Sequence, residues 1–373
     1  MLMTNIAAKL VESGININVL TDKKQQTDYK IKYVSEYVKQ WAIISSERTD
    51  ITNITFIDCM CNAGVYKDGD LCTGLEVLLI FNELAGRHPD KTYNLYLNDY
   101  DSKKIDTLKK VIPLLHVKRS NIRIIISTKD VNDYLVSLKD NKNVFGYSKI
   151  VILYIDPYDF GTVHIPKVHD ILKHNYCELI FNFFISDYVR NWKNNSERIS
   201  KCLGGTTVSS KEELVKYMEK EFKTGNIKYG FSYQFKTETN IELYQIMFFT
   251  PNKRGLEVLK DALWKVFGGK FYHKNQKELE RMQTSLFTEE DEQGWLLKLH
   301  AEEAKKLLLF NSGKTLTYSE IEMLLIEKSM VKEGQIISHV LKPLIEEGKV
   351  IKRNFNVSKR NYKSDSYEIG ESK

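Results

Sequence analysis

The sequence lacks several features that would place it in a well-known class. It has no run of about 20 apolar residues, so we expect no membrane span and no membrane partner. Its five cysteines are odd in number and irregularly spaced, which argues against a secreted disulfide scaffold. The start, MLMTNIAAKLVESG, has no apolar stretch typical of a secretory signal, so we expect a cytoplasmic protein. The chain also lacks G-x-G-x-x-G, the loop that a dinucleotide site uses.

What the sequence contains is typical of a globular protein with several domains. The 373 residues correspond to two or three domains, and 42% of them are apolar. The formal net charge of +6 is a mild basic excess, which is compatible with an anionic partner without requiring one.

Strands alternate with helices through the first half of the chain. Apolar residues at three- and four-residue steps predict a helix over 28–45, within an N-terminal helical segment 1–50. Five strands, each followed by helical or polar sequence, are then predicted at 54–58, 93–99, 121–128, 149–159 and 177–186. Such alternation indicates βαβ units and a parallel sheet buried on both faces.

Two further strands complete the predicted sheet. They lie at 229–237 and 243–250 and are followed by a helix at 254–268. The fold class is therefore α/β, a seven-stranded doubly wound Rossmann-like sheet with an antiparallel edge, spanning 51–270. The polar segment 187–226 interrupts the alternation and is interpreted as a substrate lid or a packing insert.

The C-terminal part has a different pattern. Residues 271–294 are polar and charged, and we interpret them as a linker with a helical piece. Three helical stretches and a possible hairpin follow within 295–373. Three helices followed by a β-wing are typical of a winged helix-turn-helix domain.

Acidic residues follow four successive strands of the predicted sheet. They are Asp58, Asp99, Asp130 and Asp156. A ligand of an open α/β sheet lies beyond the carboxyl ends of its strands, so these side chains are candidates for one site. The first three also have an alternative role as helix caps, although Asp101 is a better cap than Asp99.

The ligand that suits these acids carries an adenosine and a positive centre. Asp99 can accept hydrogen bonds from ribose hydroxyls, Asp130 from an adenine amine, and Asp58 from the ammonium of an amino-acid tail. The short residues around Asn62 and Gly64 would let the backbone pass close to the ligand. This combination favours S-adenosylmethionine as the cofactor.

Asp156, Pro157 and Tyr158 form the sharpest motif and are the candidate catalytic residues. The carboxylate and the exposed carbonyl can accept both hydrogens of an exocyclic amine, and the tyrosine can stack on a flat base. The motif would thus orient a base amine for methylation. The alternative is a plain strand-exit turn with a core tyrosine.

The order of these motifs resembles the three-Cys-motif partner proteins (TcmP), which have a class I S-adenosylmethionine-dependent methyltransferase fold. Residues 58–66, DCMCNAGVY, resemble that family's D-G-F-A-G-P-G-R-Y, with Asn62 and Val65 in place of a glycine and the arginine. DPY at 156–158 resembles D-P-F-G. Further resemblances cover about residues 28–355, and they mark Lys30, Tyr66 and Arg190 as candidate substrate-binding residues.

The resemblance implies a function and a partner. It implies a methyltransferase and a neighbour protein bearing three cysteines, and D-P-F-G extends by analogy to enzymes that methylate the N2 amine of a tRNA guanine. The cysteines of this chain are not that motif, and we expect no metal, since no histidine lies near Cys59, Cys61 and Cys72 in the sequence.

A basic tail points to nucleic acid. Lys352, Arg353 and Arg360 belong to a run between 349 and 363 that contains no acid, and on a wing they would follow a phosphate backbone. A docking surface for a protein is the alternative. Two other functions stay open: a catalytically inactive adaptor, which Asn62 and Val65 favour slightly, and a protein methyltransferase.

Overall fold

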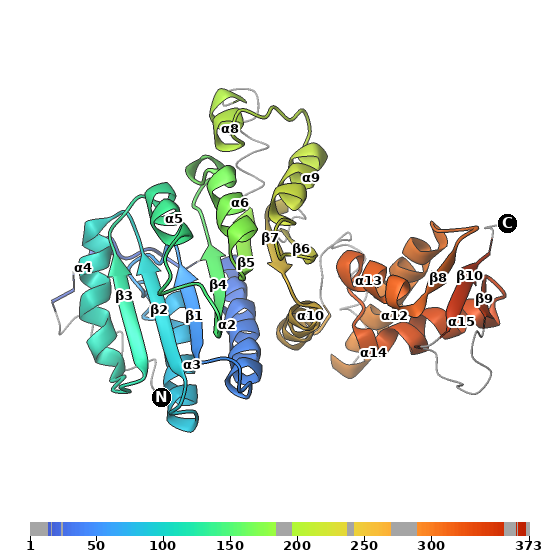
Figure 1. The fold of residues 1–373 in the computed structure, drawn as a ribbon, viewed down its shortest axis with the longest axis horizontal. Helices are drawn as coiled ribbons and strands as arrows, with labels where there is room; N and C mark the ends of the chain where they lie inside the picture. Colours follow the sequence, from blue (N-terminus) through green and yellow to red (C-terminus); the bar gives the residue numbers. More distant parts are fainter. Residues whose placement is uncertain are drawn as a thin grey trace. The chain divides into compact units, whose positions relative to one another are not determined.

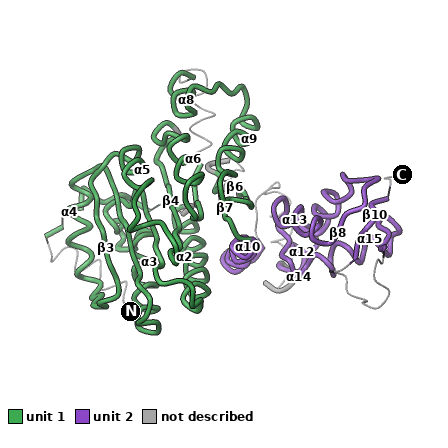
Figure 2. Tube along the Cα trace, viewed as in Figure 1, with its two compact units in different colours: residues 1–252 green, residues 253–373 purple. Residues whose placement is uncertain are grey.

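The computed structural model describes residues 14–15, 17–23, 25–183, 196–236, 242–269, 289–353, 363 and 365–370. The chain divides into two compact units, residues 1–252 and residues 253–373 (Figure 2). The division falls before helix 253–267, which the sequence analysis placed in the first domain. Each unit is described by itself below.

Unit 1 is built on the predicted seven-stranded sheet, whose order is β3-β2-β1-β4-β5-β7-β6 (Figure 1). The strands are β1 Asn53–Asp58, β2 Thr92–Asn98, β3 Ile122–Ser127, β4 Lys149–Ile155, β5 Glu178–Phe183, β6 Tyr229–Lys236 and β7 Glu242–Thr250. Six strands share one direction, and β7 runs opposite to both of its neighbours. This is the strand order of a Rossmann-like methyltransferase fold, and it confirms the predicted fold class.

The predicted antiparallel edge is confirmed: β6 and β7 pair antiparallel at one end of the sheet, and β7 lies between β5 and β6. The second strand of the β6–β7 pair inserts next to β5 and leaves the first strand outside. Strand positions in the sequence do not reveal which member of a hairpin occupies the inner place.

Helices cover both faces of this sheet. The helices of unit 1 are α2 Gln25–Ser46, α3 Thr73–Arg87, α4 Ser102–Val111, α5 Val131–Lys139, α6 Ile165–His174, α8 Ser196–Cys202 and α9 Lys211–Phe222, with 3-10 turns η1 Ile17–Val19, η2 Ile112–Leu115 and η3 Phe160–Thr162. Buried side chains of α5, α6 and α9, such as Leu135, Ile171 and Phe222, form one apolar cluster with β1, β4, β5 and β7. Helices α2 and α3 pack against each other and on β1.

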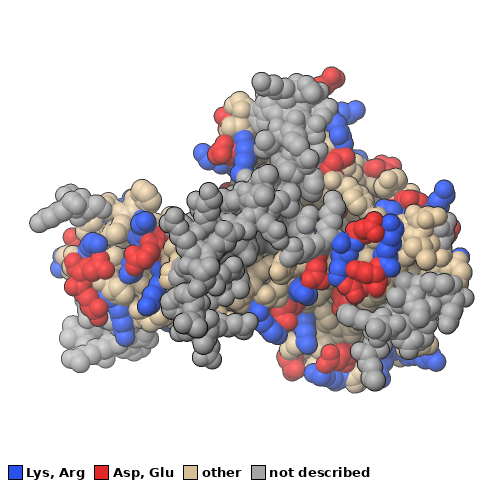
Figure 3. Space-filling model, turned by 180° about the vertical axis from the view of Figure 1, so that it is seen from behind, with Lys and Arg blue, Asp and Glu red and all other residues tan. Residues whose placement is uncertain are grey.

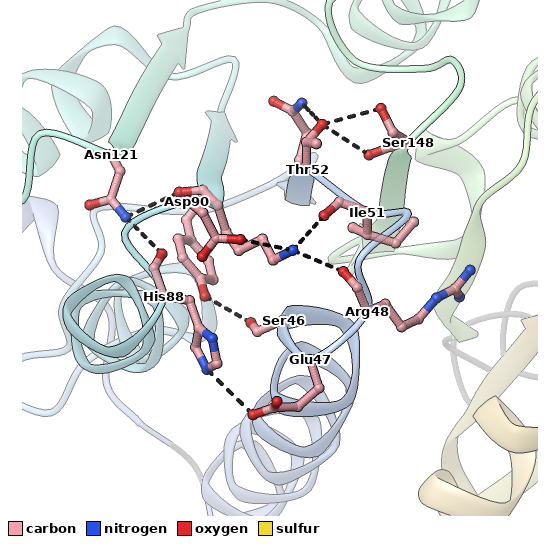
Figure 4. A network of polar contacts seen from close by, with 12 residues as sticks. Ser46, Glu47, Arg48, Ile51, Thr52, His88, Asp90, Asn121 and Ser148 are labelled. Carbon is pink, nitrogen blue, oxygen red and sulfur yellow. Dashed lines mark hydrogen bonds and ion pairs between the residues drawn. The ribbon is translucent and has the colours of Figure 1, made fainter.

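A polar network joins the turns that precede β1, β2 and β3 (Figure 4). It lies at the amino-terminal ends of these strands, whereas the acids lie at the carboxyl ends. Lys91 is 6% exposed, and its ammonium donates to the carbonyls of Arg48 at 2.8 Å and Ile51 at 2.9 Å. The Asn121 amide donates to the carbonyls of His88 and Lys91. The network fixes the starts of adjacent strands, so it also fixes where those strands end.

Unit 2 contains helices and a small antiparallel sheet in the predicted order. Its elements are α10 Lys253–Phe267, α12 Glu289–Leu309, β8 Thr315–Thr317, α13 Tyr318–Lys328, α14 Glu333–Gln335, the π-helical turn η4 Ile336–Leu341, α15 Lys342–Glu346, β9 Val350–Arg353 and β10 Ser366–Ile369. The sheet order is β8-β10-β9. Thr317 caps α13 through a capping box with Glu320. The assignment as a winged helix stays a prediction.

Two side chains explain why α10 groups with unit 2. The Lys260 ammonium, 1% exposed, donates to the carbonyl of Ser329, and burial lowers the pKa of Lys260. The Trp264 indole donates to the Met330 carbonyl at 2.8 Å. In addition, α12 begins at Glu289, inside the predicted linker 271–294.

We predict that Lys91→Met lowers the free energy of unfolding of the protein by about 2 kcal/mol, because it removes the Lys91 donor from the buried Ile51 carbonyl and the part-buried Arg48 carbonyl. Urea denaturation followed by circular dichroism measures this change. Lys109→Met is the matched control, since Lys109 is a half-exposed residue with one surface ion pair, and it should change stability by less than about 0.5 kcal/mol. Equal effects of the two substitutions would contradict the structural role of Lys91.

Candidate functional site

Three of the four predicted acids lie close together at the carboxyl ends of neighbouring strands. Strands β2, β1 and β4 are neighbours in the sheet, and Asp99, Asp58 and Asp156 stand at or just after their carboxyl ends. Asp58 and Asp99 are each 2% exposed. Among the described residues, Lys30 of α2 forms an ion pair with Asp156, and no ion pair involves Asp58 or Asp99. Because these strands are parallel neighbours, the three acidic side chains that follow them lie close together.

Asp58 is the most perturbed of these acids. Burial raises the pKa of its carboxyl to about 8; the Met60 N–H, which donates to Oδ1 at 3.1 Å, opposes that rise. The carboxylates of Asp156 and Asp99 raise the pKa further, and Lys30 lowers it. A ligand that brings a positive charge would therefore stabilise the ionised form of Asp58.

Asn62 takes the place of a loop glycine by adopting the left-handed conformation, with φ of 58°. Asparagine tolerates this conformation better than most residues. The Asn62 N–H donates to Asp99 Oδ2 at 3.0 Å, and the Asn62 side-chain oxygen accepts from the Ala63 N–H at 2.9 Å. The loop therefore satisfies its own N–H groups and does not present these two donors to an anionic ligand.

Gly64 has a packing role in the structure, and its role in close approach to a ligand stays a prediction. Its φ is 78°, and a Cβ added there would lie 2.5 Å from a Leu108 methyl and 2.7 Å from a Leu75 methyl. The glycine is thus required by packing against α3 and α4. The expectation that Gly64 serves close approach to a ligand is not supported by this contact, because the missing Cβ points at the protein's own leucines.

Asp156 is held by three side chains. Lys30 pairs with Oδ2, the Tyr154 hydroxyl donates to Oδ2 at 3.2 Å, and the Asn182 amide donates to Oδ1 at 2.5 Å. Oδ1 retains a lone pair, so the carboxylate can still accept a further hydrogen bond. Tyr154 was not predicted as a site residue. Its place within a buried strand looks like core packing, so the sequence carries no signal for it.

Tyr158 lies half-exposed beside Asp156, with 51% of its surface accessible. Its hydroxyl accepts a hydrogen bond from the Lys104 ammonium of α4 at 3.0 Å, and that ammonium lies 4.7 Å from the ring centroid. Pro157 is buried. The Tyr158 ring is exposed, as stacking on a base would require. The contact with Lys104 was not predicted.

Tyr66 and Cys72 lie beside the strand-end acids. They are hydrogen-bonded to each other, and both lie close enough to Asp156 to feel its charge. Burial raises the pKa of the Cys72 thiol to about 12 and the pKa of the Tyr66 hydroxyl above its ordinary value. Both groups are therefore neutral near pH 7.

A hollow of about 230 Å³ opens beside Asp99, between the ends of β2 and β3. Its lining residues are Cys59, Met60, Asn98, Asp99, Tyr100, Lys129, Asp130, Val131 and Thr162. Asp130 lines the hollow and also caps α5, since its side chain accepts from the Asn132 N–H at 2.8 Å. Asp130 therefore has the helix-capping role that the sequence analysis gave as an alternative, and it also borders the hollow.

The predicted lid is described only from residue 196 onward, and Arg190 lies outside the described residues. Helix α8 is fastened to the turn after Tyr158. The Arg198 guanidinium pairs with Asp159 at 2.7 Å, and it lies where a Cβ on Gly161 would be, 2.2 Å away. Only a glycine at 161 leaves room for this contact.

The basic residues of the tail are paired with acids in unit 2. Lys352 pairs with the buried Asp365 at 2.6 Å, and the Arg353 guanidinium donates two hydrogen bonds to Glu368. Arg360 lies outside the described residues. Basic and acidic side chains also lie next to each other on the face shown in Figure 3. Although the run between 349 and 363 contains no acid, Lys352 and Arg353 therefore pair with acids that lie outside it.

Comparisons with known proteins give fold-level likenesses. No family profile matches the sequence, and no curated protein matches it. A Legionella pneumophila protein of the DUF519 family is 8% identical, with a TM-score of 0.39, covering 65% of this chain and 94% of its own. A Listeria monocytogenes protein described as a class I S-adenosylmethionine-dependent methyltransferase is 14% identical, with a TM-score of 0.33 and 66% of each chain covered.

A third solved structure is a mutant of the 16S rRNA (adenine(1408)-N(1))-methyltransferase from Catenulisporales acidiphilia, 10% identical, with a TM-score of 0.30, covering 57% of this chain and 90% of its own. These TM-scores are low, so the fold assignment rests on the strand order. Membership of the TcmP family is not shown by any comparison. Among the described residues, no helix is both long and apolar enough to cross a membrane.

We predict that Asp58→Asn stabilises the protein at pH 9 and leaves its stability near pH 4 almost unchanged. The pKa of Asp58 rises from an ordinary 3.8 to about 8 on folding, so the acid lowers the stability progressively as pH rises between these values. The gain at pH 9 should reach several kcal/mol, at about 1.4 kcal/mol per pKa unit.

Urea denaturation of both proteins at pH 4, 6 and 9 tests this expectation. Glu178, whose pKa burial raises to about 7, is present in both proteins and cancels from the difference. A stability difference that does not grow with pH would show that the Asp58 carboxyl is not the buried acid described here.

Proposed function

We propose that this protein is an S-adenosylmethionine-dependent methyltransferase whose acceptor is an exocyclic amine of a nucleic-acid base. The observation that carries the proposal is that Asp58, Asp99 and Asp156 lie close together at the carboxyl ends of neighbouring strands, where Lys30 pairs with Asp156. Such a site suits a ligand with a positive centre. A pyrophosphate would meet negative charge there, and the Asn62 and Ala63 amides are already bonded.

The residues present fit this cofactor. Asp58 would hold the ammonium of its amino-acid tail, Asp99 the ribose hydroxyls, and the hollow next to Asp130 the adenine. When bound, the cofactor supplies a methyl group on a sulfonium that is already reactive, so the protein mainly positions donor and acceptor. Asn62 supports this arrangement indirectly, by fixing the loop between β1 and Gly64.

Asp156 and Tyr158 would position the acceptor. Asp156 Oδ1 would accept a hydrogen from the amine and help to take up its proton, and the Tyr158 ring would stack on the base. Lys30 pairs with the Asp156 carboxylate beside two other acids. Tyr66 stands next to both groups and would contact the same substrate.

Nucleic acid as the substrate class is favoured by the Asp156-Pro157-Tyr158 motif. The tail of unit 2 adds little, since Lys352 and Arg353 would first have to exchange their acidic partners for phosphates. The winged-helix assignment of unit 2 and a partner protein bearing three cysteines are part of the proposal and rest on the sequence pattern alone.

Binding of S-adenosylmethionine to the purified protein is expected in isothermal titration calorimetry. Asp99→Ala should weaken this binding at least tenfold, because it removes an acceptor at the ribose position and the support of Asn62. Tyr147→Ala is the control, since Tyr147 is 92% exposed and distant in the fold from the strand ends, and it should bind like the wild type. Absence of heat at millimolar cofactor would favour the inactive adaptor instead.

Transfer of radiolabelled methyl groups identifies the acceptor class. We expect label in total tRNA or in DNA but not in protein, and a loss of about 100-fold in rate for Asp156→Ala and for Tyr158→Ala. Tyr147→Ala should retain full activity. Label only in protein would support the protein-methyltransferase alternative, and full activity of Asp156→Ala would refute the acceptor assignment.

A further inference from the structure

We propose that Arg198 of α8 is a positioning residue for the methyl acceptor: acting through Asp159, it holds the Tyr158 ring in the place where a substrate base would stack. This inference rests on the proposed function and gives a role to the described part of the predicted lid. It follows from the contacts that fasten the turn after Tyr158 to α8.

The motif Asp156-Pro157-Tyr158 is anchored on both sides of the tyrosine. Before it, three side chains hold the Asp156 carboxylate, and the ring of Pro157 fixes the backbone torsion φ at the next position. After it, Asp159 Oδ1 accepts a hydrogen bond from the Arg198 guanidinium at 2.7 Å. The backbone of Tyr158 therefore lies between two anchored carboxylates.

The contact of α8 with this turn is more than an exposed ion pair. A Cβ added to Gly161 would overlap the guanidinium of Arg198, so the guanidinium packs directly against the glycine backbone. The Cys202 thiol donates to the Gly161 carbonyl at 3.1 Å. The Thr162 hydroxyl donates to the same Asp159 oxygen that Arg198 contacts, at 2.8 Å. Together these contacts fix the turn against the helix.

Helix α8 is a firm support because it is anchored in the core of unit 1. Ile199 of α8 and Leu203, which follows the helix, are buried in the apolar cluster that α5, α6 and α9 form with the sheet. The Tyr217 hydroxyl of α9 donates to the Leu203 carbonyl at 2.8 Å. The described part of the predicted lid therefore has the rigidity that holding a turn in place requires.

The ion pair and the tyrosine ring are both held near neutral pH. Burial opposes ionisation of Asp159, but the Arg198 guanidinium and the Thr162 hydroxyl hold the pKa of its carboxyl below the ordinary value. At the other end of the ring, the Lys104 ammonium donates to the Tyr158 hydroxyl. A base stacked on this ring would be placed by it, and methyl transfer needs reacting atoms about 3–3.5 Å apart and aligned.

Methyl-transfer kinetics of Arg198→Gln and Asp159→Asn test the proposal, with the nucleic acid that the wild-type protein labels as acceptor. Both substitutions remove a charge and keep a polar side chain. We expect each to lower kcat about tenfold, because a displaced Tyr158 ring leaves fewer bases in a reactive position. The affinity for S-adenosylmethionine, measured by calorimetry, should change less than about twofold, since the cofactor would be held by other strand ends.

The double variant shows whether the two residues act through one contact. We expect its kcat to lie within about threefold of either single variant, whereas independent residues would lose about a hundredfold together. Gly161→Ala should also lower kcat about tenfold, because its Cβ displaces the flexible arginine without changing the backbone. Lys201→Ala is the matched control on the same helix, and this exposed residue should leave kcat and cofactor affinity unchanged.

Four outcomes count against the idea. Wild-type kcat in Arg198→Gln and Gly161→Ala would refute the positioning role while the methyltransferase function stands. An equal loss of kcat and cofactor affinity would mean that α8 supports the whole site rather than the acceptor. Additive losses in the double variant would contradict action through Asp159. If the wild-type protein labels no nucleic acid, the proposed function falls together with this inference.

The variants are chosen so that the fold survives. The side chains of Arg198 and Asp159 are 49% and 39% exposed, and neither belongs to the apolar cluster. If one of the two single variants does not fold, the other and Gly161→Ala decide the outcome.

Discussion

The crowding of carboxylates at one edge of a parallel sheet is the constraint on which the rest of unit 1 depends. Three adjacent strands end in acids, and two of these acids are almost completely buried. Such an arrangement lowers the stability of the folded chain, because buried like charges repel and lose their hydration. Lys30, the Met60 N–H and the loop amides each compensate a part of the cost, and burial still raises the pKa of Asp58 to about 8.

The loop after β1 shows how a departure from a glycine-rich pattern is accommodated. Asn62 reaches a backbone conformation that glycine would adopt freely, and its side chain then bonds to the next N–H group. The result is a loop closed on itself and tied to Asp99. This closure explains how Asn62 fits the methyltransferase-like fold, and it also makes the loop a poor site for a phosphate or a carboxylate.

Charge is arranged differently in unit 2. Its acidic and basic residues are largely partnered: Lys253 lies between Glu257 and Glu322, and Lys363 pairs with Glu333. The three glutamates come close to one another, and the lysines act as their counter-ions. Lysines that already pair with glutamates are typical of a solvated protein surface. A phosphate that bound these lysines would have to compete with the existing ion pairs.

The sequence alone determined the alternation of strands and helices, the acids at the strand ends and the DPY motif, because periodicity and strand-end residues are local properties of the chain. Only the tertiary structure decided that β7 lies inside β6, that Gly64 serves packing, that Tyr154 and Asn182 hold Asp156, and that the basic tail meets acids from distant positions. Each of these depends on which segments become neighbours. A linear pattern does not contain that information, since residues more than a hundred positions apart, such as Lys30 and Asp156, make the contacts that define the site.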